Sequence, residues 1–213
     1  MKLFSYWRST TSFRVRGALN LKGLQYELRP VDLVAGEQAA PTYKSINPGK
    51  GVPTLVLDDG TVLTQSMAIL EYLDEAYPTP PLQPEALIMR TLSRATASAV
   101  ATDIHPVNNL RVVNALKSRF DVGAAQLKDW MCHWMAEGFQ TVETLLPGNA
   151  SFSFGEAPGI ADLCIVAQCY NARRWGLDLS PYIRVQAVEA ACLKVPEIQA
   201  AHPDNQPDRT IDA

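Results

Sequence analysis

The chain has 213 residues, of which 47% are hydrophobic and 19% charged, and its formal net charge at pH 7 is −3. A chain of this length forms one domain or two small ones, and it buries about 70% of its unfolded surface without a disulfide or metal to complete the core. The slightly acidic balance excludes a dedicated nucleic-acid-binding protein. No stretch approaches the ~18 apolar residues of a membrane span, and early charges interrupt any signal peptide. We therefore expect a cytoplasmic protein without nucleic-acid or membrane partners.

The elements predicted for the first third of the chain alternate between strands and helices. Period-2 and apolar runs predict strands at residues 2–6, 26–31, 53–57 and 61–64. Helical spacing of apolar residues predicts helices at residues 12–22, 37–45 and 65–77. Asp58-Asp59-Gly60 joins the last two strands as a hairpin turn. The expected order of elements is βαβαββα.

A proline-rich segment, Pro-Thr-Pro-Pro at residues 78–81, follows this pattern. Proline blocks both helix continuation and sheet pairing, so the segment predicts a domain boundary. Strand signals nearly vanish beyond it, and apolar residues recur at helical spacing over residues 127–142 and 160–174. We therefore expect one domain at residues 1–79 and an all-helical second domain at residues 85–213.

The cysteines all lie in the second domain and show neither Cys-x-x-Cys nor zinc-like spacing. They are Cys132, Cys164, Cys169 and Cys192. This usage predicts reduced thiols that serve as small core residues, and it predicts no metal site. The first domain has no cysteine at all, which excludes thioredoxin-type disulfide exchange.

A hydroxyl cluster follows the first predicted strand, where Arg8 precedes Ser9, Thr10, Thr11 and Ser12. In one interpretation these side chains only cap the next helix, which typically contributes ~1 kcal/mol. In the other, a hydroxyl and the positive end of the helix stabilise a bound anion such as a thiolate. The cluster alone does not decide between the two.

Two further segments favour a ligand site. Gly51-Val52-Pro53-Thr54 introduces the third strand, where a proline is tolerated at an edge or in a specialised turn, sometimes with a cis peptide. Gln65 and Ser66 open a helix directly after a strand, where backbone amides and the helix dipole favour a carboxylate. Capping explains Ser66 equally well.

Together these segments resemble the zeta class of glutathione transferases over nearly the whole chain. Residues 8–19, Arg-Ser-Thr-Thr-Ser-Phe-Arg-Val-Arg-Gly-Ala-Leu, are similar to the class signature Ser-Ser-Cys-x-x-Arg-Val-Arg-Ile-Ala-Leu. The resemblance implies an α/β thioredoxin-like N-terminal domain that binds glutathione and an all-α C-terminal domain that binds the substrate. It also implies a homodimer.

The resemblance assigns catalytic roles within the hydroxyl cluster. Ser9 matches the serine that stabilises the glutathione thiolate, Thr10 matches the second serine, and Thr11 stands at the position of the cysteine. That cysteine supports reductive dehalogenation but not isomerisation, so Thr11 favours an isomerase. The glutathione contacts that the resemblance implies are Gln38, Val52, Gln65, Ser66, His105 and Asn109.

The second domain carries the remaining assignments. Residues 103–111, Asp-Ile-His-Pro-Val-Asn-Asn-Leu-Arg, resemble the zeta segment Gly-Ile-Gln-Pro-Leu-Gln-Asn-Leu, which makes His105 a glutathione contact. A lone histidine before proline is otherwise a helix-bend or core residue. Arg8, Arg111 and Arg174 match substrate-binding positions, and a guanidinium suits a carboxylate. Simple surface exposure remains the alternative for each arginine.

The implied activity is cis–trans isomerisation of maleylpyruvate or maleylacetoacetate with glutathione as cofactor. Thiolate addition makes the cis double bond single, rotation follows, and elimination restores the bond as trans. Two alternatives stay open. A conjugase or dehalogenase acting on α-halo acids would consume glutathione, and a non-catalytic relative would bind glutathione without turnover.

Overall fold

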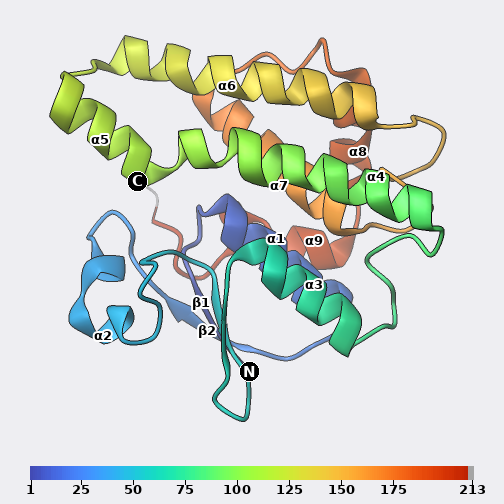
Figure 1. Ribbon diagram of the computed structural model, residues 1–213, viewed down its shortest axis with the longest axis horizontal. Coiled ribbons are helices and arrows are strands. Elements are labelled where there is room, and N and C mark those ends of the chain that lie inside the picture. Colours follow the sequence, from blue (N-terminus) through green and yellow to red (C-terminus); the bar gives the residue numbers. More distant parts are fainter. Residues whose placement is uncertain (211–213) are drawn as a thin grey trace. The chain divides into compact units, whose positions relative to one another are not determined.

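A computed structural model describes residues 1–210, and the chain divides into two compact units (Figure 1). The first unit is Met1–Leu82 together with the segment that begins at Leu193, and the second is Gln83–Cys192. Within residues 1–210, no helix has the length and apolar composition needed to cross a bilayer.

The first unit contains a sheet with the strand order β2-β1-β3-β4. Strands β1 and β2 are parallel, whereas β3 is antiparallel to both β1 and β4. The predicted βαβαββα order is confirmed, with most element ends shifted by one or two residues, but the helix expected at residues 37–45 is divided into a 3₁₀ helix and a short α-helix. The elements are β1 (Lys2–Ser5), α1 (Thr10–Leu21), β2 (Glu27–Pro30), η1 (Glu37–Ala39), α2 (Pro41–Lys44), β3 (Thr54–Val56), β4 (Val62–Thr64), α3 (Ser66–Ala76), α9 (Pro196–Ala201) and η4 (Pro203–Asn205).

Helix α1 is the centre of packing in this unit, because it contacts both α3 and α9 (Figure 1). It buries Phe13 and Leu19 completely. It also buries two arginines, since Arg14 is 1% exposed and Arg16 is 0% exposed. A buried guanidinium is costly unless its donors are used, so the partners of these two side chains matter.

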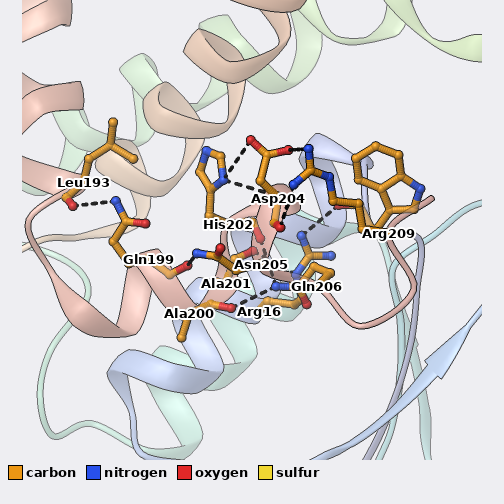
Figure 2. Close-up of polar contacts among 11 residues, drawn as sticks. Arg16, Leu193, Gln199, Ala200, Ala201, His202, Asp204, Asn205, Gln206 and Arg209 are labelled. Atoms are coloured by element: carbon orange, nitrogen blue, oxygen red, sulfur yellow. Dashed lines mark hydrogen bonds and ion pairs between the residues drawn. The ribbon is translucent and has the colours of Figure 1, made fainter. Parts of the chain in front are cut away.

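Arg16 ties the C-terminal segment, shown with Arg16 in Figure 2, to Ser5 at the end of β1. Its Nε donates to the Ala201 carbonyl at 3.0 Å, and its Nη1 donates to Ser5 Oγ at 2.9 Å. Its Nη2 donates to the Trp7 carbonyl at 3.1 Å. The Trp7 amide in turn donates to Asp208 Oδ2 at 2.9 Å. These bonds explain why the chain from Leu193 onward groups with the first unit, whereas the sequence placed it in the helical domain.

Lys22 anchors the proline-rich segment to the same unit. Its buried Nζ donates to Asp74 Oδ1 at 3.0 Å and to the carbonyls of Tyr77 at 2.6 Å and Pro80 at 2.5 Å. Asp74 also accepts from the Leu82 amide at 2.7 Å. The segment therefore packs as part of the first unit, whose N-terminal stretch runs to Leu82.

The second unit is built from helices, as predicted. Helix α7 contacts α4, α6 and α8, and residues 160–169 of α7 are buried on every side. A helix that is buried all round is typical of a domain core. The elements are α4 (Leu87–Ser98), the π-helix η2 (Ala99–Ile104), η3 (Pro106–Asn108), α5 (Leu110–Phe120), α6 (Ala124–Leu145), α7 (Ile160–Trp175) and α8 (Ile183–Cys192).

The start of α7 is held by a buried carboxylate. Asp162 accepts hydrogen bonds of 2.8 Å from the Ser153 amide, the Ser153 hydroxyl and the Gly159 amide. Burial raises the pKa of the Asp162 carboxyl, while these hydrogen bonds oppose the rise. Asp162 therefore fixes the preceding loop and the first turn of the central helix.

Candidate active site

The loop after β1 brings Ser9, Thr11 and Val52 together. Ser9 is the N-cap of α1, and its Oγ accepts from the Ser12 amide at 3.2 Å. Ser9 Oγ also lies 2.8 Å from Thr11 Oγ1, which donates to the Val52 carbonyl at 2.8 Å. The capping interpretation of this cluster is thus observed, and it places the same hydroxyl at the positive end of α1.

The direction of the hydroxyl bonds follows from counting protons. Thr11 has one hydroxyl proton, and its bond to the Val52 carbonyl uses it. Ser9 must then donate its own proton to Thr11. A hydroxyl rotates readily, so Ser9 can turn its proton from Thr11 to an incoming anion. Ser9 therefore has a hydroxyl proton that it can donate to an anion at the N-terminus of α1.

Two side chains from α2 and the loop after it fix the turn that precedes β3. The Val52–Pro53 peptide is cis, one of the conformations that the sequence suggested. The Gly51 carbonyl accepts from Tyr43 Oη at 2.5 Å and from Asn47 Nδ2 at 2.9 Å. These contacts fix the backbone on which Val52 is presented, and sequence reasoning gave Tyr43 and Asn47 no role.

Gln65 has a strained backbone, with φ at 69° and ψ at 115°. Non-glycine residues rarely adopt positive φ, and such strain, of about 1–3 kcal/mol, clusters at functional sites. Gln65 is exposed and its side chain does not cap α3, while Ser66 is buried as the first residue of that helix. The residue type does not predict this backbone conformation, because glutamine has no preference for positive φ.

The buried side chain of Arg14 contacts Ser66 at the start of α3. Its Nη1 donates to Ser66 Oγ at 3.4 Å. Sequence reasoning treated Arg14 only as part of the class signature, and nothing in its spacing along the chain reveals the contact.

The other predicted residues of the first unit lie outside this hydroxyl chain. Thr10 is 7% exposed and begins α1. Gln38 lies in η1, where its Nε2 donates to the Leu33 carbonyl at 3.4 Å. Arg8 is half-buried, with its guanidinium 5.2 Å from the centre of the Trp7 ring.

In the second unit, His105 and Asn109 contact each other. Asn109 Oδ1 caps α5 by accepting from the Arg111 amide at 3.1 Å, which turns Asn109 Nδ2 towards His105 Nε2 at 3.3 Å. An amide nitrogen only donates, so His105 Nε2 is the acceptor and carries no proton in this contact. Arg111 itself is exposed in the first turn of α5.

The two adjacent arginines at the end of α7 have different roles. Arg173 forms a two-pronged ion pair with the buried Glu189 of α8, with bonds of 2.9 and 2.5 Å. Arg174 is exposed, contacts Asn171 at 3.3 Å, and lies with its guanidinium 5.4 Å from the centre of the Trp175 ring. Arg173 is therefore committed to packing α7 against α8, and Arg174 remains the candidate substrate ligand.

Comparisons with known proteins identify the family of the chain. Residues 1–75 match the family Glutathione S-transferase, N-terminal domain. The maleylacetoacetate isomerase of Pseudomonas aeruginosa is 42% identical over 98% of this chain and 98% of its own length. The maleylpyruvate isomerase of a Ralstonia species is 43% identical over 98% of this chain and 99% of its own length.

Solved structures show the same similarity. The holo structure of a maleylpyruvate isomerase, described as a bacterial glutathione S-transferase of the zeta class, superposes with a TM-score of 0.96 at 42% identity, covering 99% of this chain and 100% of that one. The maleylacetoacetate isomerase of Anaeromyxobacter dehalogenans, with bound dicarboxyethyl glutathione and citrate, gives 0.87 at 43% identity, covering 98% and 97%. The fold and the matched domain define a glutathione S-transferase. Within that class, the chain belongs to the zeta-class family of maleylacetoacetate and maleylpyruvate isomerases.

Proposed function

We propose that this protein is a glutathione-dependent cis–trans isomerase that converts maleylpyruvate or maleylacetoacetate to the fumaryl isomer. The observation that carries the proposal is the chain of hydroxyl hydrogen bonds at the N-terminus of α1. In this chain Ser9 has a hydroxyl proton that it can donate to a thiolate. Family membership supplies the reaction class.

The chemistry requires glutathione to add and leave again. A double bond conjugated to a carbonyl does not rotate, but addition of the thiolate at one alkene carbon makes it single and moves an electron pair onto the carbonyl oxygen as an enolate. Collapse of the enolate after rotation expels the thiolate and forms the trans alkene, so glutathione is regenerated. In dicarboxyethyl glutathione, which a relative binds, sulfur is bonded to a saturated dicarboxylate carbon, as in the proposed adduct.

The chain supplies two kinds of stabilisation. Ser9 and the α1 terminus lower the thiol pKa from ~8.5 towards neutrality. Gln65 and Ser66 hold the γ-glutamyl end of glutathione, with Gln38, Val52, His105 and Asn109 as further contacts. Arg8, Arg111 and Arg174 bind the substrate carboxylates and stabilise the enolate.

No protein thiol is needed in this mechanism. All of the cysteines are free, and only Cys132 is not fully buried. Burial raises the pKa of the Cys169 and Cys192 thiols well above the usual range, and desolvation also raises the pKa of Cys132. These side chains stay protonated at neutral pH and are poor nucleophiles.

Replacement of Ser9 by alanine tests the proposal. We expect Ser9→Ala to lower kcat/KM for isomerisation about 100-fold, because one preorganised donor to the reacting sulfur is lost. The pKa of the bound glutathione thiol, followed by thiolate absorbance in the ultraviolet, should rise in the same variant. Ser98→Ala, at an exposed position of α4, serves as the control and should change neither quantity.

The glutathione concentration measured during turnover distinguishes the alternative functions. An isomerase forms the fumaryl product while the glutathione concentration stays constant. Consumption of glutathione with halide release from α-halo acids would identify a conjugase or dehalogenase instead. Binding of glutathione without turnover of either maleyl acid would identify a non-catalytic relative.

The choice between the two maleyl acids rests on pocket depth, which changes discrimination by about 1–3 kcal/mol per methylene. His105, Thr11 and the run Ala172-Arg173-Arg174 favour maleylpyruvate. We expect a higher kcat/KM for maleylpyruvate when the two acids are assayed side by side.

We also propose a cytoplasmic homodimer. Unpaired cysteines suit a reducing compartment. Several large apolar side chains lie exposed on the separate units, including Val62 at 41%, Leu87 at 66% and Ile88 at 69%. Contiguous apolar surface, unlike a single exposed apolar side chain, is typical of subunit interfaces, and Leu87 and Ile88 are adjacent at the start of α4. Sedimentation equilibrium should give twice the mass of one chain.

A further inference from the structure

Arg14 is a buried charge without a protein counter-ion. It is 1% exposed, and it forms no ion pair with any carboxylate in the part of the chain that the structure describes. Its Nη1 reaches Ser66 Oγ at 3.4 Å, while its Nε and Nη2 are buried without a hydrogen-bond partner among residues 1–210. Buried donors without acceptors lower the stability of the folded protein, so the presence of Arg14 at this position needs an explanation.

Arg16 provides the comparison on the same helix. It is equally buried, but its guanidinium donates to Ala201, Ser5, Tyr6 and Trp7. The fold therefore satisfies a buried arginine two residues away with backbone and hydroxyl oxygens. The unsatisfied donors of Arg14 are a feature of its own position and not of helix α1 in general.

That position is the start of α3. Ser66 is the first residue of the helix, and the N-cap residue Gln65 provides no side-chain hydrogen bond to the free amides. These amides and the helix dipole favour an anion. Because Ser66 Oγ accepts from Arg14, the Ser66 hydroxyl proton points elsewhere and remains available to an acceptor.

We propose that Arg14 is a positioning residue for the α-carboxylate of the γ-glutamyl group of glutathione. It acts through Ser66, whose hydroxyl it orients to donate, and its positive charge is balanced only when the carboxylate is bound. The inference rests on the proposed function, because it takes glutathione as the ligand of this site. It adds a residue that never touches the ligand but makes one end of the site selective for a carboxylate.

The test compares glutathione with 4-aminobutyryl-cysteinyl-glycine, which lacks only the α-carboxylate. Dissociation constants for both peptides are measured by calorimetry on the wild-type protein and on Arg14→Met. We expect the wild-type preference for glutathione to fall about tenfold in Arg14→Met, as for a lost hydrogen bond to a charged group. Affinity for the decarboxylated peptide should change little, and Arg14→Lys should restore part of the preference.

Arg16→Met is the matched control, because it removes a buried arginine whose donors all serve the protein. It should lower stability while the ratio of the two dissociation constants stays at the wild-type value. Arg14→Met should be no less stable than the wild type without ligand, since it removes an unbalanced buried charge. A merely structural Arg14 would give the opposite result, with lower stability and an unchanged ratio.

A measurement on the wild-type protein covers the case in which the variants do not fold. The Nε resonance of Arg14 in 15N-labelled protein should shift on saturation with glutathione and much less with the decarboxylated peptide. Equal shifts, or an unchanged preference in a folded Arg14→Met, would overturn the inference while isomerase activity persists. Failure of the wild-type protein to bind glutathione would instead overturn the proposed function.

Discussion

At the scale of single residues, the site depends on conformations and protons that are held ready before a ligand arrives. Ser9 donates its hydroxyl proton to Thr11 and can rotate the hydroxyl towards a ligand. Gln65 has a strained backbone at the start of α3. The strained backbone of Gln65 lowers the stability of the protein. Both features make sense as preorganisation for binding, in which a ligand meets groups that are already oriented.

Gln65→Gly separates the strain from the side chain. Glycine relieves about 1–3 kcal/mol of strain and loses about 0.4–1 kcal/mol through the more flexible unfolded chain, so we expect equal or slightly higher stability in urea unfolding. The KM for glutathione should nevertheless rise, because the side chain is gone. Asp121→Gly, at another residue with positive φ (52°), should change stability in the same direction as Gln65→Gly and leave the KM for glutathione unchanged. A fall in stability with unchanged KM would refute the binding role of Gln65.

At the scale of elements, the end of helix α7 gives two neighbouring side chains different surroundings. Arg173 and Arg174 both lie in the last turn of α7, where Arg173 pairs with the buried Glu189 of α8 and Arg174 is exposed. The helical turn points the two guanidinium groups in different directions, since successive residues lie about 100° apart. The packing of α7 on α8 thus assigns one arginine to structure and leaves the other exposed.

The paired variants Arg173→Met and Arg174→Met should therefore differ. Arg173→Met leaves the Glu189 carboxylate buried without its partner, and we expect a loss of about 1–3 kcal/mol in the free energy of unfolding. Arg174→Met should change stability by less than about 0.5 kcal/mol, as for an exposed side chain, but lower kcat/KM for the maleyl substrate. Chemical denaturation and steady-state kinetics measure both variants, and the reverse pattern would exchange the two roles.

At the scale of the whole chain, residues from near the start of the sequence and residues around position 200 pack in one unit. The Trp7 amide and Asp208 are 201 residues apart and hydrogen-bonded at 2.9 Å. Arg16 of α1 adds its bond to the Ala201 carbonyl. The loop that carries Ser9 is therefore held in place by residues that lie far along the chain, so this unit cannot complete its contacts until the segment that begins at Leu193 has been made.

Asp208→Ala tests this dependence. Loss of the acceptor for the Trp7 amide should lower the free energy of unfolding by about 1–2 kcal/mol. The control is Asp204→Ala, which removes a solvent-exposed ion pair with Arg209 at 3.5 Å and should cost less than about 1 kcal/mol. Equal effects of the two variants in urea unfolding would show that Asp208 is no more than a surface charge.

Local signals in the sequence were sufficient to predict the elements, and they also supplied the residues of the proposed site. The alternation of strand and helix periods predicted the βαβαββα order, and helical spacing predicted the second unit, because hydrophobic periodicity depends on residues a few positions apart. The class signature around Ser9 and the pair Gln65-Ser66 are likewise short segments. The glutathione transferase fold and its reaction class could therefore be predicted from the chain by itself.

Tertiary structure alone decided the rest, because it depends on contacts between residues far apart in the sequence. Nothing local shows that the buried Arg14 contacts Ser66, 52 residues away, or that Arg173 pairs with the buried Glu189 of α8. Nothing local shows that Gln65 has positive φ, or that the chain after Leu193 returns to the first unit. Hydrophobic periodicity specifies which face of an element is buried, but only the assembled fold specifies which charges are buried with it and what neutralises them.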